Sequence, residues 1–562
     1  MIKSAIQYNS LIQQRNLHVL HASVNSFFRI LQFFFCSFFL SNPAFSQVSA
    51  VDTRVLEQQL LQPDLLKLKK TDLADLQRLY TTRRFQPIWM TAEPESALLA
   101  AAIDFIASSE TEGLDSRDYR LEQLRQLQQQ VNQSLPAAIE LELLTSHAVL
   151  MLARDLTRGK LQASLADPDW HIPQATFDAV AFLQQAIETN RLPQSLHDLS
   201  PQKHHYQLLK QTLIRYQSLM HNHANWNPIP AAKTLHPGEA DAIIPLIRQR
   251  MAQTYDIDGN TLYHLAPSSS PQYDAELVTA IKAFQIQHGL IADGVIGKNT
   301  IRALNIPLEW KIRQLRINME RLRWLPADLG QRYVLVNTAG FRLTAVKQDE
   351  PPLSMRIIVG RDYRSTPSFN GALSHMVLNP YWTVPVSIAT KDLLPKQKKN
   401  PDYFTSNGFK IYSGHNRTLE PINPDTIDWQ AINKAFPYVL KQDPGTHNAL
   451  GRIKFMFSNS FSIYLHDTPS KSLFQKDIRT FSSGCIRLEK PLELAAFLLG
   501  EQSLPDKFLA DMDNGKTKTV HLPGQTPIYL VYSTAWVDEQ GQIHFSPDIY
   551  RRDLRALQYA GW

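Results

Sequence analysis

The sequence is organised around one stretch near its C-terminal end, which begins Tyr464-Leu465-His466-Asp467-Thr468-Pro469 and ends Phe481-Ser482-Ser483-Gly484-Cys485-Ile486-Arg487. Ile463 and Leu465 alternate with Tyr464 and His466, a period of two that predicts a half-buried strand. The two apolar side chains then face the core. Tyr464 and His466 share the opposite face, where a substrate could meet them.

An imidazole at His466 and a thiol at Cys485 are the two reactive groups of this stretch. A thiol is a strong nucleophile as the thiolate, and a neighbouring histidine commonly generates one near neutral pH. A lone cysteine is more often a small buried hydrophobic residue. The sequence around this pair favours catalysis over that alternative.

The residues that flank Cys485 predict a flexible loop followed by a helix. Ser482-Ser483-Gly484 lets backbone N–H groups approach a substrate carbonyl closely. The amides around Ser483, Gly484 and Cys485 could therefore form the oxyanion hole that acyl transfer requires. Pro491 and Gly500 bracket an apolar run and predict a short helix between them.

This combination resembles the signature of the L,D-transpeptidases, the enzymes with a YkuD-type catalytic domain. Their pattern is a His, a gap that Asp467 to Phe481 matches, then Ser or Thr, His, Gly and Cys, followed by an apolar residue and Arg. Ser483 replaces the second His of many members. The larger members with a helical scaffold often have Ser-Ser-Gly-Cys, as here, and the change leaves His466 as the nearby base.

The resemblance implies peptidoglycan L,D-transpeptidation on tetrapeptide stems, with Cys485 as nucleophile and His466 as base. It implies no metal and no organic cofactor. The expected partners are peptidoglycan stem peptides and glycan, together with other cell-wall synthesis proteins. Substrate-binding positions would be taken by Tyr464, Ser482, Arg487 and Trp382. Arg487 could equally hold the local loop or pair with a core acid.

The N-terminal residues have the layout of a secretory signal. Residues 1–29 carry Lys3, Arg15 and Arg29 without an acidic residue, and a short Phe-rich apolar run follows from Ile30 to Leu40. Small residues then suit cleavage before Gln47. We expect export to the periplasm after loss of residues 1–46; an uncleaved segment would instead anchor the chain in the inner membrane.

Charge and cysteine content agree with export. The chain has 2 Cys and a net charge of +6. Loss of residues 1–46 would remove Cys36 and three cations, leaving Cys485 as an unpaired thiol on a mildly basic protein. This charge makes no case for nucleic acid as a partner, and an anionic wall polymer requires no more.

Residues 47–235 predict an all-α scaffold domain, because apolar residues recur with helical spacing and β-branched runs are few. Three segments resemble, in this order, the scaffold region of the long L,D-transpeptidases. They are Arg84-Phe85-Gln86-Pro87-Ile88-Trp89, Glu112-Gly113-Leu114-Asp115 and Asp167-Pro168-Asp169-Trp170.

Residues 236–308 predict a small helical module that resembles a peptidoglycan-binding domain. The matching residues are Phe284-Gln285 and Asp293-Gly294-Val295-Ile296-Gly297. The module either binds peptidoglycan or acts as a folded spacer. Residues 309–332 predict a linker helix, basic and amphipathic, that connects the domains.

Residues 333–562 predict a mainly β catalytic domain, in which Tyr333–Val336 and Phe341–Leu343 form a hairpin around Ala339-Gly340. The segments Arg361–Pro367 and Asn379–Pro385 again resemble the long L,D-transpeptidases. Residues 386–449 are polar and rich in Pro and Gly, as in a long functional loop. By resemblance we expect a lid over the active site.

Two other functions are compatible with the same residues. If water resolves the acyl-enzyme, the protein is an L,D-carboxypeptidase. If the site is dormant, the chain is a non-catalytic cell-wall-binding scaffold. Retention of both His466 and Cys485 with the expected gap argues against dormancy.

Overall fold

A computed structural model describes most of the chain from residue 51 onward. The described residues are 51–61, 66–91, 97–222, 227–255, 265–266, 268–413 and 419–562. They belong to the second of two compact units, Val48–Trp562. The expected signal segment, residues 1–46, lies outside the described residues.

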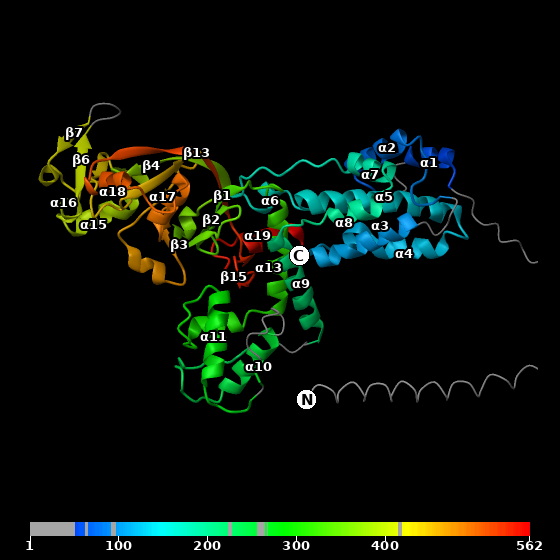
Figure 1. Ribbon diagram of the computed structural model, residues 1–562, viewed down its shortest axis with the longest axis horizontal. Coiled ribbons are helices and arrows are strands. Elements are labelled where there is room, and N and C mark those ends of the chain that lie inside the picture. The colour runs from blue at the N-terminus through cyan, green and yellow to red at the C-terminus, as the bar shows by residue number, and fades with distance from the viewer. Residues whose placement is uncertain are drawn as a thin grey trace, which may run out of the picture. The chain divides into compact units, whose positions relative to one another are not determined.

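The N-terminal part of this unit is helical, as predicted, and its helices other than α6 and α9 gather around a common apolar core (blue to cyan in Figure 1). The helices are α1 Thr53–Leu60, α2 Lys70–Thr82, α3 Ala97–Ala107, α4 Leu121–Gln130, α5 Leu135–Arg158, α6 Ala163–Ala166, α7 Ala179–Glu188, α8 Leu192–Asp198 and α9 His204–Asn222, with 3-10 turns η2 Ser108–Glu112 and η3 Ser116–Tyr119.

Helix α5 lies at the centre of this bundle. Among the described residues it is the one helix long and apolar enough to cross a membrane, but 78% of its most apolar window is buried inside the protein. Its Glu142 accepts hydrogen bonds from the backbone N–H groups of Ile88, Trp89 and Met90. The Ile88-Trp89 part of the first scaffold motif is therefore a loop fixed by a buried carboxylate.

Among its described residues, the central module contains three helices, α10 Ile244–Tyr255, α11 Ala275–Gln287 and α12 Lys298–Leu304. The Gln285 side chain donates to Asp293 and accepts from the N–H of Gly294, which fixes the glycine turn before α12. Three of the residues that resemble a peptidoglycan-binding domain, Gln285, Asp293 and Gly294, thus stabilise the fold of the module. Its core also includes Ile229 and Leu235, so the module begins earlier than the predicted residue 236.

Helix α13, Leu308–Arg323, is the predicted connector and lies alongside α9 (Figure 1). Its apolar residues Ile312, Leu315 and Met319 are buried in one cluster, as expected for an amphipathic helix. Several of its polar side chains are buried too, because further structure covers the opposite face. That structure comes from two parts of the chain, the helical scaffold beside Arg323 and the C-terminal segment beside Arg321.

The catalytic domain is built on a nine-stranded sheet in the order β11-β3-β12-β10-β9-β4-β13-β1-β2, and β2 pairs with β3 as well, so the sheet closes on itself. The strands are β1 Arg332–Asn337, β2 Arg342–Lys347, β3 Leu353–Gly360, β4 Phe369–Leu378, β9 Ile453–Phe457, β10 Leu465–His466, β11 Thr480–Ser482, β12 Ile486–Leu488 and β13 Lys518–Val531. The predicted hairpin is confirmed as the antiparallel pair β1 and β2.

Helices α17 Pro491–Leu499 and α18 Asp506–Asp513 pack on the core of this sheet. The predicted cap is confirmed, since Pro491 is the first helical residue and Gly500 ends α17 with a φ of 83°. The same part of the chain also contains two 3-10 turns, a second hairpin and a C-terminal helix. These are η4 Asp362–Arg364, η7 Lys471–Gln475, the hairpin of β14 Ala535–Val537 and β15 Ile543–Phe545, and α19 Arg552–Ala560.

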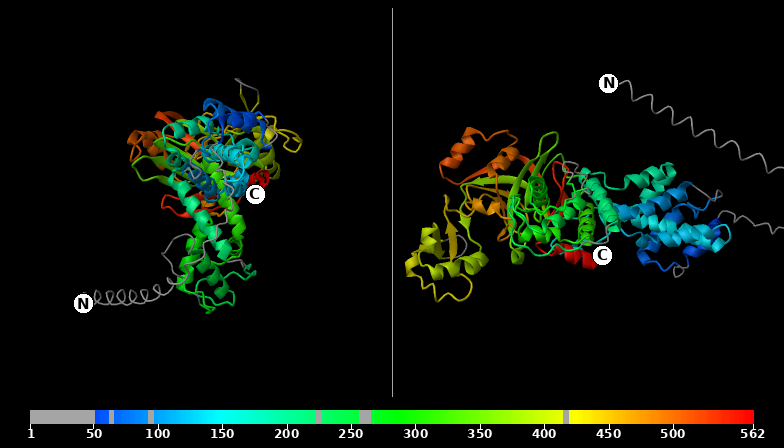
Figure 2. Two further views of the ribbon diagram at one scale, coloured as in Figure 1. Left: turned by 90° about the vertical axis from the view of Figure 1, so that its right-hand side faces the viewer. Right: turned by 90° about the horizontal axis from the view of Figure 1, so that it is seen from below.

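The segment predicted as a long loop is instead a folded unit (yellow in Figures 1 and 2), here called the lid unit and comprising residues 382–449. It has a four-stranded sheet in the order β5-β8-β6-β7. Its elements are β5 Trp382–Thr383, α14 Val386–Ile388, the π-helical turn η5 Ala389–Leu393, α15 Leu394–Lys399, α16 Tyr403–Ser406, β6 Phe409–Ser413, β7 Glu420–Ile422, the 3-10 turn η6 Pro424–Thr426 and β8 Val439–Gln442.

An aromatic core explains why the lid unit folds despite its polar sequence. Phe404 is fully buried and meets Phe409, Trp429 and Phe436 with ring centroids 5.4 to 6.0 Å apart. Widely spaced aromatic residues can supply a compact core without any regular hydrophobic period.

Candidate active site

A cavity of about 740 Å³ lies between the loop that carries Cys485 and the lid unit. Cys485, His466, Tyr464, Ser482, Ser483, Arg487 and Trp382 all line it. The structure therefore brings together seven of the eight residues that the sequence singled out. The eighth, Gly484, is buried in contact with Gly360.

Strand pairing positions the two reactive residues. Strand β10 runs parallel to β12, with Leu465 opposite Ile486 and His466 opposite Arg487. The N–H of Ile486 donates to the carbonyl of Tyr464, which places Cys485 at the level of Tyr464. The predicted alternation holds, because Ile463 and Leu465 are buried in the core while Tyr464 and His466 face the cavity. The strand is only two residues long, and His466 is more buried than the half-buried prediction required.

Burial keeps both reactive groups uncharged in the resting protein. Burial, reinforced by the charge of Arg487, lowers the pKa of His466 to about 3. Burial also raises the pKa of the Cys485 thiol. The structure therefore favours a neutral thiol beside a neutral imidazole, because desolvation penalises the charged form of each group. The neutral imidazole remains able to accept a proton.

Three further groups surround the Cys485 sulfur. The thiol donates to the carbonyl of Ser462, with 3.8 Å between Sγ and O. Tyr464 partly opposes the rise in the thiol pKa through its backbone N–H and its hydroxyl. The Nζ of Lys454 lies 5.7 Å from the Tyr464 ring centroid, and its charge also favours the thiolate.

The loop before Cys485 is held by the hydroxyl of Ser482. Ser482 Oγ donates to the carbonyl of Cys485 over 2.5 Å and accepts from the N–H of Gly484 over 3.1 Å. The Gly484 amide is thus already hydrogen-bonded in the unliganded protein, and its predicted place in the oxyanion hole stays a prediction. Among the described residues, the N–H groups of Ser483 and Cys485 have no hydrogen-bond acceptor, so these two amides remain as candidates.

Two guanidinium groups, Arg361 and Arg487, line the cavity near the thiol. Burial, together with the charge of Arg361, lowers the pKa of Arg487. Neither side chain has an acidic partner within the part of the chain that the structure describes, and Arg487 Nε is buried without a hydrogen bond. The alternative in which Arg487 pairs with a core acid is therefore not found. A buried cation is costly without an anion, which makes this pair a candidate anion site.

Arg364 connects the loop of Cys485 to the lid unit. Its Nη1 donates to Ser483 Oγ over 2.8 Å and forms an ion pair with Asp392. Its Nη2 lies 3.3 Å from the carbonyl of Ser387. Sequence analysis singled out the segment that contains Arg361 and Arg364 but gave neither residue a role.

Trp382 enters the cavity wall from the lid unit, where it pairs with Gln442 and lies 6.1 Å from the Phe409 ring. Lys396, one of the clustered lysines of this unit, also lines the cavity. Within the described ranges no group of three or more His, Cys, Asp or Glu side chains is arranged to hold a metal ion. The chemistry available is that of a thiol, an imidazole, two free amides and several cations.

Three family models match the chain in separate regions. Residues 331–529 match the "L,D-transpeptidase catalytic domain", residues 74–213 a "Scaffold domain" and residues 260–304 a "Putative peptidoglycan binding domain". The scaffold match lies inside residues 47–235 and the peptidoglycan-binding match inside residues 236–308, whereas the catalytic-domain match begins at residue 331, two residues before the predicted start of that domain.

A protein of Haemophilus influenzae named "Putative L,D-transpeptidase" is 37% identical over 242 residues. The match covers 43% of this chain and 48% of that protein, so it spans about half the length of the relative. Two crystal structures of L,D-transpeptidases are also similar. That from Xylanimonas cellulosilytica is 15% identical, with a TM-score of 0.18, and covers 54% of this chain and 99% of its own. That from Stackebrandtia nassauensis is 12% identical, with a TM-score of 0.21, and covers 54% of this chain and 97% of its own.

Proposed function

We propose that this chain, which carries an L,D-transpeptidase catalytic domain together with a scaffold domain and a peptidoglycan-binding domain, forms 3–3 cross-links in peptidoglycan. The proposed donor is a tetrapeptide stem, which loses D-alanine through a cysteinyl acyl-enzyme. The observation that carries this proposal is the shared cavity of Cys485, His466 and the cations Arg361 and Arg487.

In the proposed acylation step, the Cys485 sulfur attacks the carbonyl carbon of the third stem residue. The thiol proton moves to the neutral imidazole of His466 as the carbon–sulfur bond forms, because neither group is charged beforehand. The imidazolium then protonates the departing amine of D-alanine as the amide bond breaks. A thioester remains on Cys485.

In the second step, the amine of another stem attacks the thioester. His466 accepts the amine proton and returns it to the sulfur as the carbon–sulfur bond breaks. The N–H groups of Ser483 and Cys485 would hold the oxyanion in both steps. Loss of one such donor typically costs about 3 kcal/mol of transition-state stabilisation.

The arginine pair supports a peptide stem as the substrate, because such stems carry free carboxylates. Arg487 lies opposite His466 in the sheet, and both Arg361 and Arg487 lie in the cavity wall. A guanidinium matches a carboxylate with paired hydrogen bonds, so the two cations would orient the donor stem over Cys485. We also propose that the protein acts in the periplasm, where this polymer lies.

Incubation with purified tetrapeptide muropeptides, followed by mass spectrometry, tests the proposal. A dimer lighter than two substrates by one D-alanine is expected from the native protein and not from the Cys485→Ala variant. Tripeptide without dimer would replace the proposal by L,D-carboxypeptidase activity. No product, with a Cys485 that also resists acylation by a carbapenem, would leave a non-catalytic wall-binding protein.

A further inference from the structure

The scaffold motif Asp167-Pro168-Asp169-Trp170 contacts the catalytic domain directly. Trp170 forms a parallel bridge with Ser368, the residue before strand β4. The N–H of Ser368 donates to the carbonyl of Asp169 over 2.8 Å, and the N–H of His171 donates to the carbonyl of Ser368 over 2.7 Å. The motif therefore adds a short edge to the segment that precedes β4.

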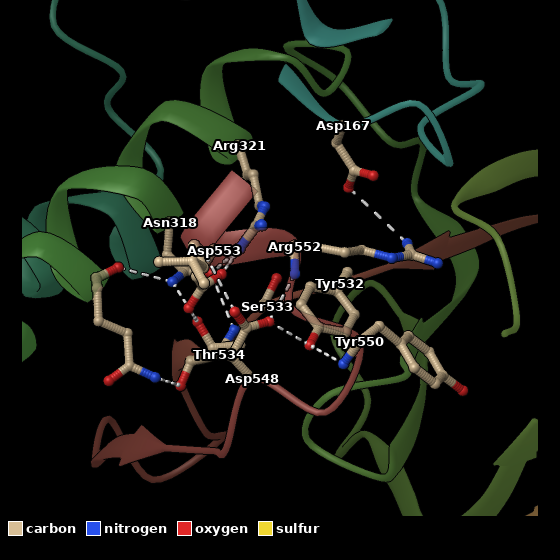
Figure 3. A network of polar contacts seen from close by, with 12 residues as sticks. Asp167, Asn318, Arg321, Tyr532, Ser533, Thr534, Asp548, Tyr550, Arg552 and Asp553 are labelled. Atoms are coloured by element: carbon tan, nitrogen blue, oxygen red, sulfur yellow. Dashed lines mark hydrogen bonds and ion pairs between the residues drawn. The ribbon is translucent and has the colours of Figure 1, made fainter. Parts of the chain in front are cut away.

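Arg552, the first residue of α19, lies fully buried between the scaffold and the catalytic domain (Figure 3). Its guanidinium nitrogens lie 3.8 Å from Asp167 and 3.2 Å from Asp169. The same group donates to the carbonyl of Thr366 over 2.9 Å. Because a buried guanidinium requires both charge compensation and hydrogen-bond acceptors, the scaffold carboxylates fix where Arg552 can hold Thr366.

Thr366 connects this network to the nucleophile. Its hydroxyl donates to the carbonyl of Gly484 over 2.8 Å and accepts from the N–H of Gly360 over 3.0 Å. Thr366 is fully buried, and a Cβ on Gly360 would lie only 3.2 Å from the Gly484 Cα. The peptide between Gly484 and Cys485 supplies both the Gly484 carbonyl and the Cys485 amide. Holding that carbonyl therefore orients a candidate oxyanion donor.

The neighbouring network keeps Arg552 in place (Figure 3). Asp548 accepts from the N–H of Arg552 over 2.8 Å and from the Tyr532 hydroxyl over 2.6 Å. The Tyr550 hydroxyl donates to the carbonyl of Gly360 over 2.6 Å. The residues that hold Thr366 in place thus come from two distant parts of the chain, Gly360 on one side and Tyr550 and Arg552 on the other.

A second contact reaches the other side of the sulfur. The ring of His171 lies 4.8 Å from that of Phe461, which lines the cavity. The next residue, Ser462, provides the carbonyl that accepts the Cys485 thiol. The scaffold segment 167–171 therefore borders both segments that flank the nucleophile.

We propose that Arg552 and Thr366 are positioning residues through which Asp167 and Asp169 of the scaffold domain orient the Cys485 amide. This proposal rests on the proposed function only in taking Cys485 to be acylated. It gives the scaffold motif a role in the reaction beyond joining two domains. A displacement of about 1 Å at a reacting centre can cost about 100-fold in rate, so contacts remote from the substrate can control it.

Thr366→Val removes the hydroxyl while keeping the side-chain volume, and Thr366→Ser keeps the hydroxyl. Acylation of Cys485 by p-nitrophenyl acetate requires the oxyanion amide, whereas alkylation by iodoacetamide does not. We expect Thr366→Val to slow acylation by about 10- to 100-fold and to leave alkylation within about threefold of the native rate. Thr366→Ser should restore acylation to within about threefold of native.

The scaffold part has its own pair of variants. Asp169→Asn removes the charge nearer to Arg552 from a partly exposed site, and Asp75→Asn breaks an ion pair with Arg154 elsewhere in the scaffold. Acylation should slow in the first and stay native in the second. Circular dichroism and thermal melting establish that each variant is folded.

Native acylation by a folded Thr366→Val variant would overturn the role of Thr366. If that variant does not fold, equal acylation rates in Asp169→Asn and Asp75→Asn would overturn the proposal. Neither readout uses a stem peptide. If the native protein forms no 3–3 product while the variants show the expected acylation rates, the proposed function is refuted and this inference stands.

Discussion

At the scale of single residues, burial decides how His466 and Cys485 can react. Desolvation lowers the pKa of the imidazole and raises that of the thiol, and both effects oppose a resting ion pair. The proposed proton transfer therefore accompanies the attack on the substrate. A thiol that stays protonated until substrate arrives is also less open to oxidation.

The depressed pKa of His466 predicts a pH dependence of stability. Between about pH 3 and pH 6.5 the unfolded chain binds a proton at His466 that the folded protein does not, so this residue destabilises the fold increasingly as the pH falls. In His466→Asn, the loss of unfolding free energy between pH 7 and pH 4.5 should be smaller by about 2 to 3 kcal/mol.

Urea titrations of both proteins at the two pH values measure this difference. The variant also changes packing, but that effect is present at both pH values and cancels in the comparison. Identical pH dependence in the two proteins would mean that His466 titrates normally in the folded state.

Sequence identified seven of the residues that line the cavity but not how they are connected. Local pattern placed Tyr464 and His466 on one face, because strand alternation depends only on neighbouring residues. It could not show that the N–H of Gly484 donates to the Ser482 hydroxyl, since the same sequence is compatible with a free or a hydrogen-bonded Gly484 amide. Arg361 lies far from Cys485 in sequence and reaches it only through the pairing of β3 with β11 and β12.

At the scale of elements, the lid unit is the clearest difference between sequence and structure. Its aromatic residues are separated by polar and Pro-containing segments, so no periodic pattern predicts a fold. Helix α17, by contrast, is fully local: Pro491, a continuous apolar run and Gly500 specify both its ends. Local signals were sufficient there and insufficient in the lid unit.

The Arg364–Asp392 ion pair joins the lid unit to the loop of Cys485, so its loss should weaken substrate binding and catalysis. We expect Asp392→Asn to lower kcat/KM for a tetrapeptide donor by about 5- to 20-fold, equivalent to about 1 to 2 kcal/mol. Lys410→Gln is the matched control, because it removes an exposed ion pair with Asp443 inside the lid unit.

Steady-state kinetics measures the loss of kcat/KM, and hydrogen exchange across residues 386–399 measures whether this part of the lid unit opens more readily. Exchange should rise in Asp392→Asn and stay native in Lys410→Gln. Unchanged kcat/KM and exchange in Asp392→Asn would show that the ion pair does not restrain the lid unit.

At the scale of the whole molecule, the peptidoglycan-binding module touches the segment between the two reactive residues. Asp477 accepts hydrogen bonds from the N–H of Ile291 and from the Asn299 side chain.

The order of the helical and β parts followed from hydrophobic period. The packing of β14 and β15 against α9 and α13 did not, because it joins residues that are remote in sequence.

Replacing residues 229–306 with a short Gly-Ser linker should reduce the fraction of protein that pellets with purified sacculi. Asp477→Asn is the control, because it weakens the contact while retaining the module. Pelleting should fall severalfold in the first variant and remain native in the second. Native pelleting without the module would reduce it to a folded spacer.

The position of Arg552 in the sequence has a consequence for biosynthesis. Synthesis proceeds from the N-terminus, so Cys485 and Thr366 leave the ribosome before the arginine that Thr366 contacts in the folded protein. Domains can begin to fold as they emerge, but the loop of Cys485 lacks this buried support until α19 follows. The loop of Cys485 therefore gains its buried support only once α19 has been made, later than the scaffold and the module, which precede it in the chain.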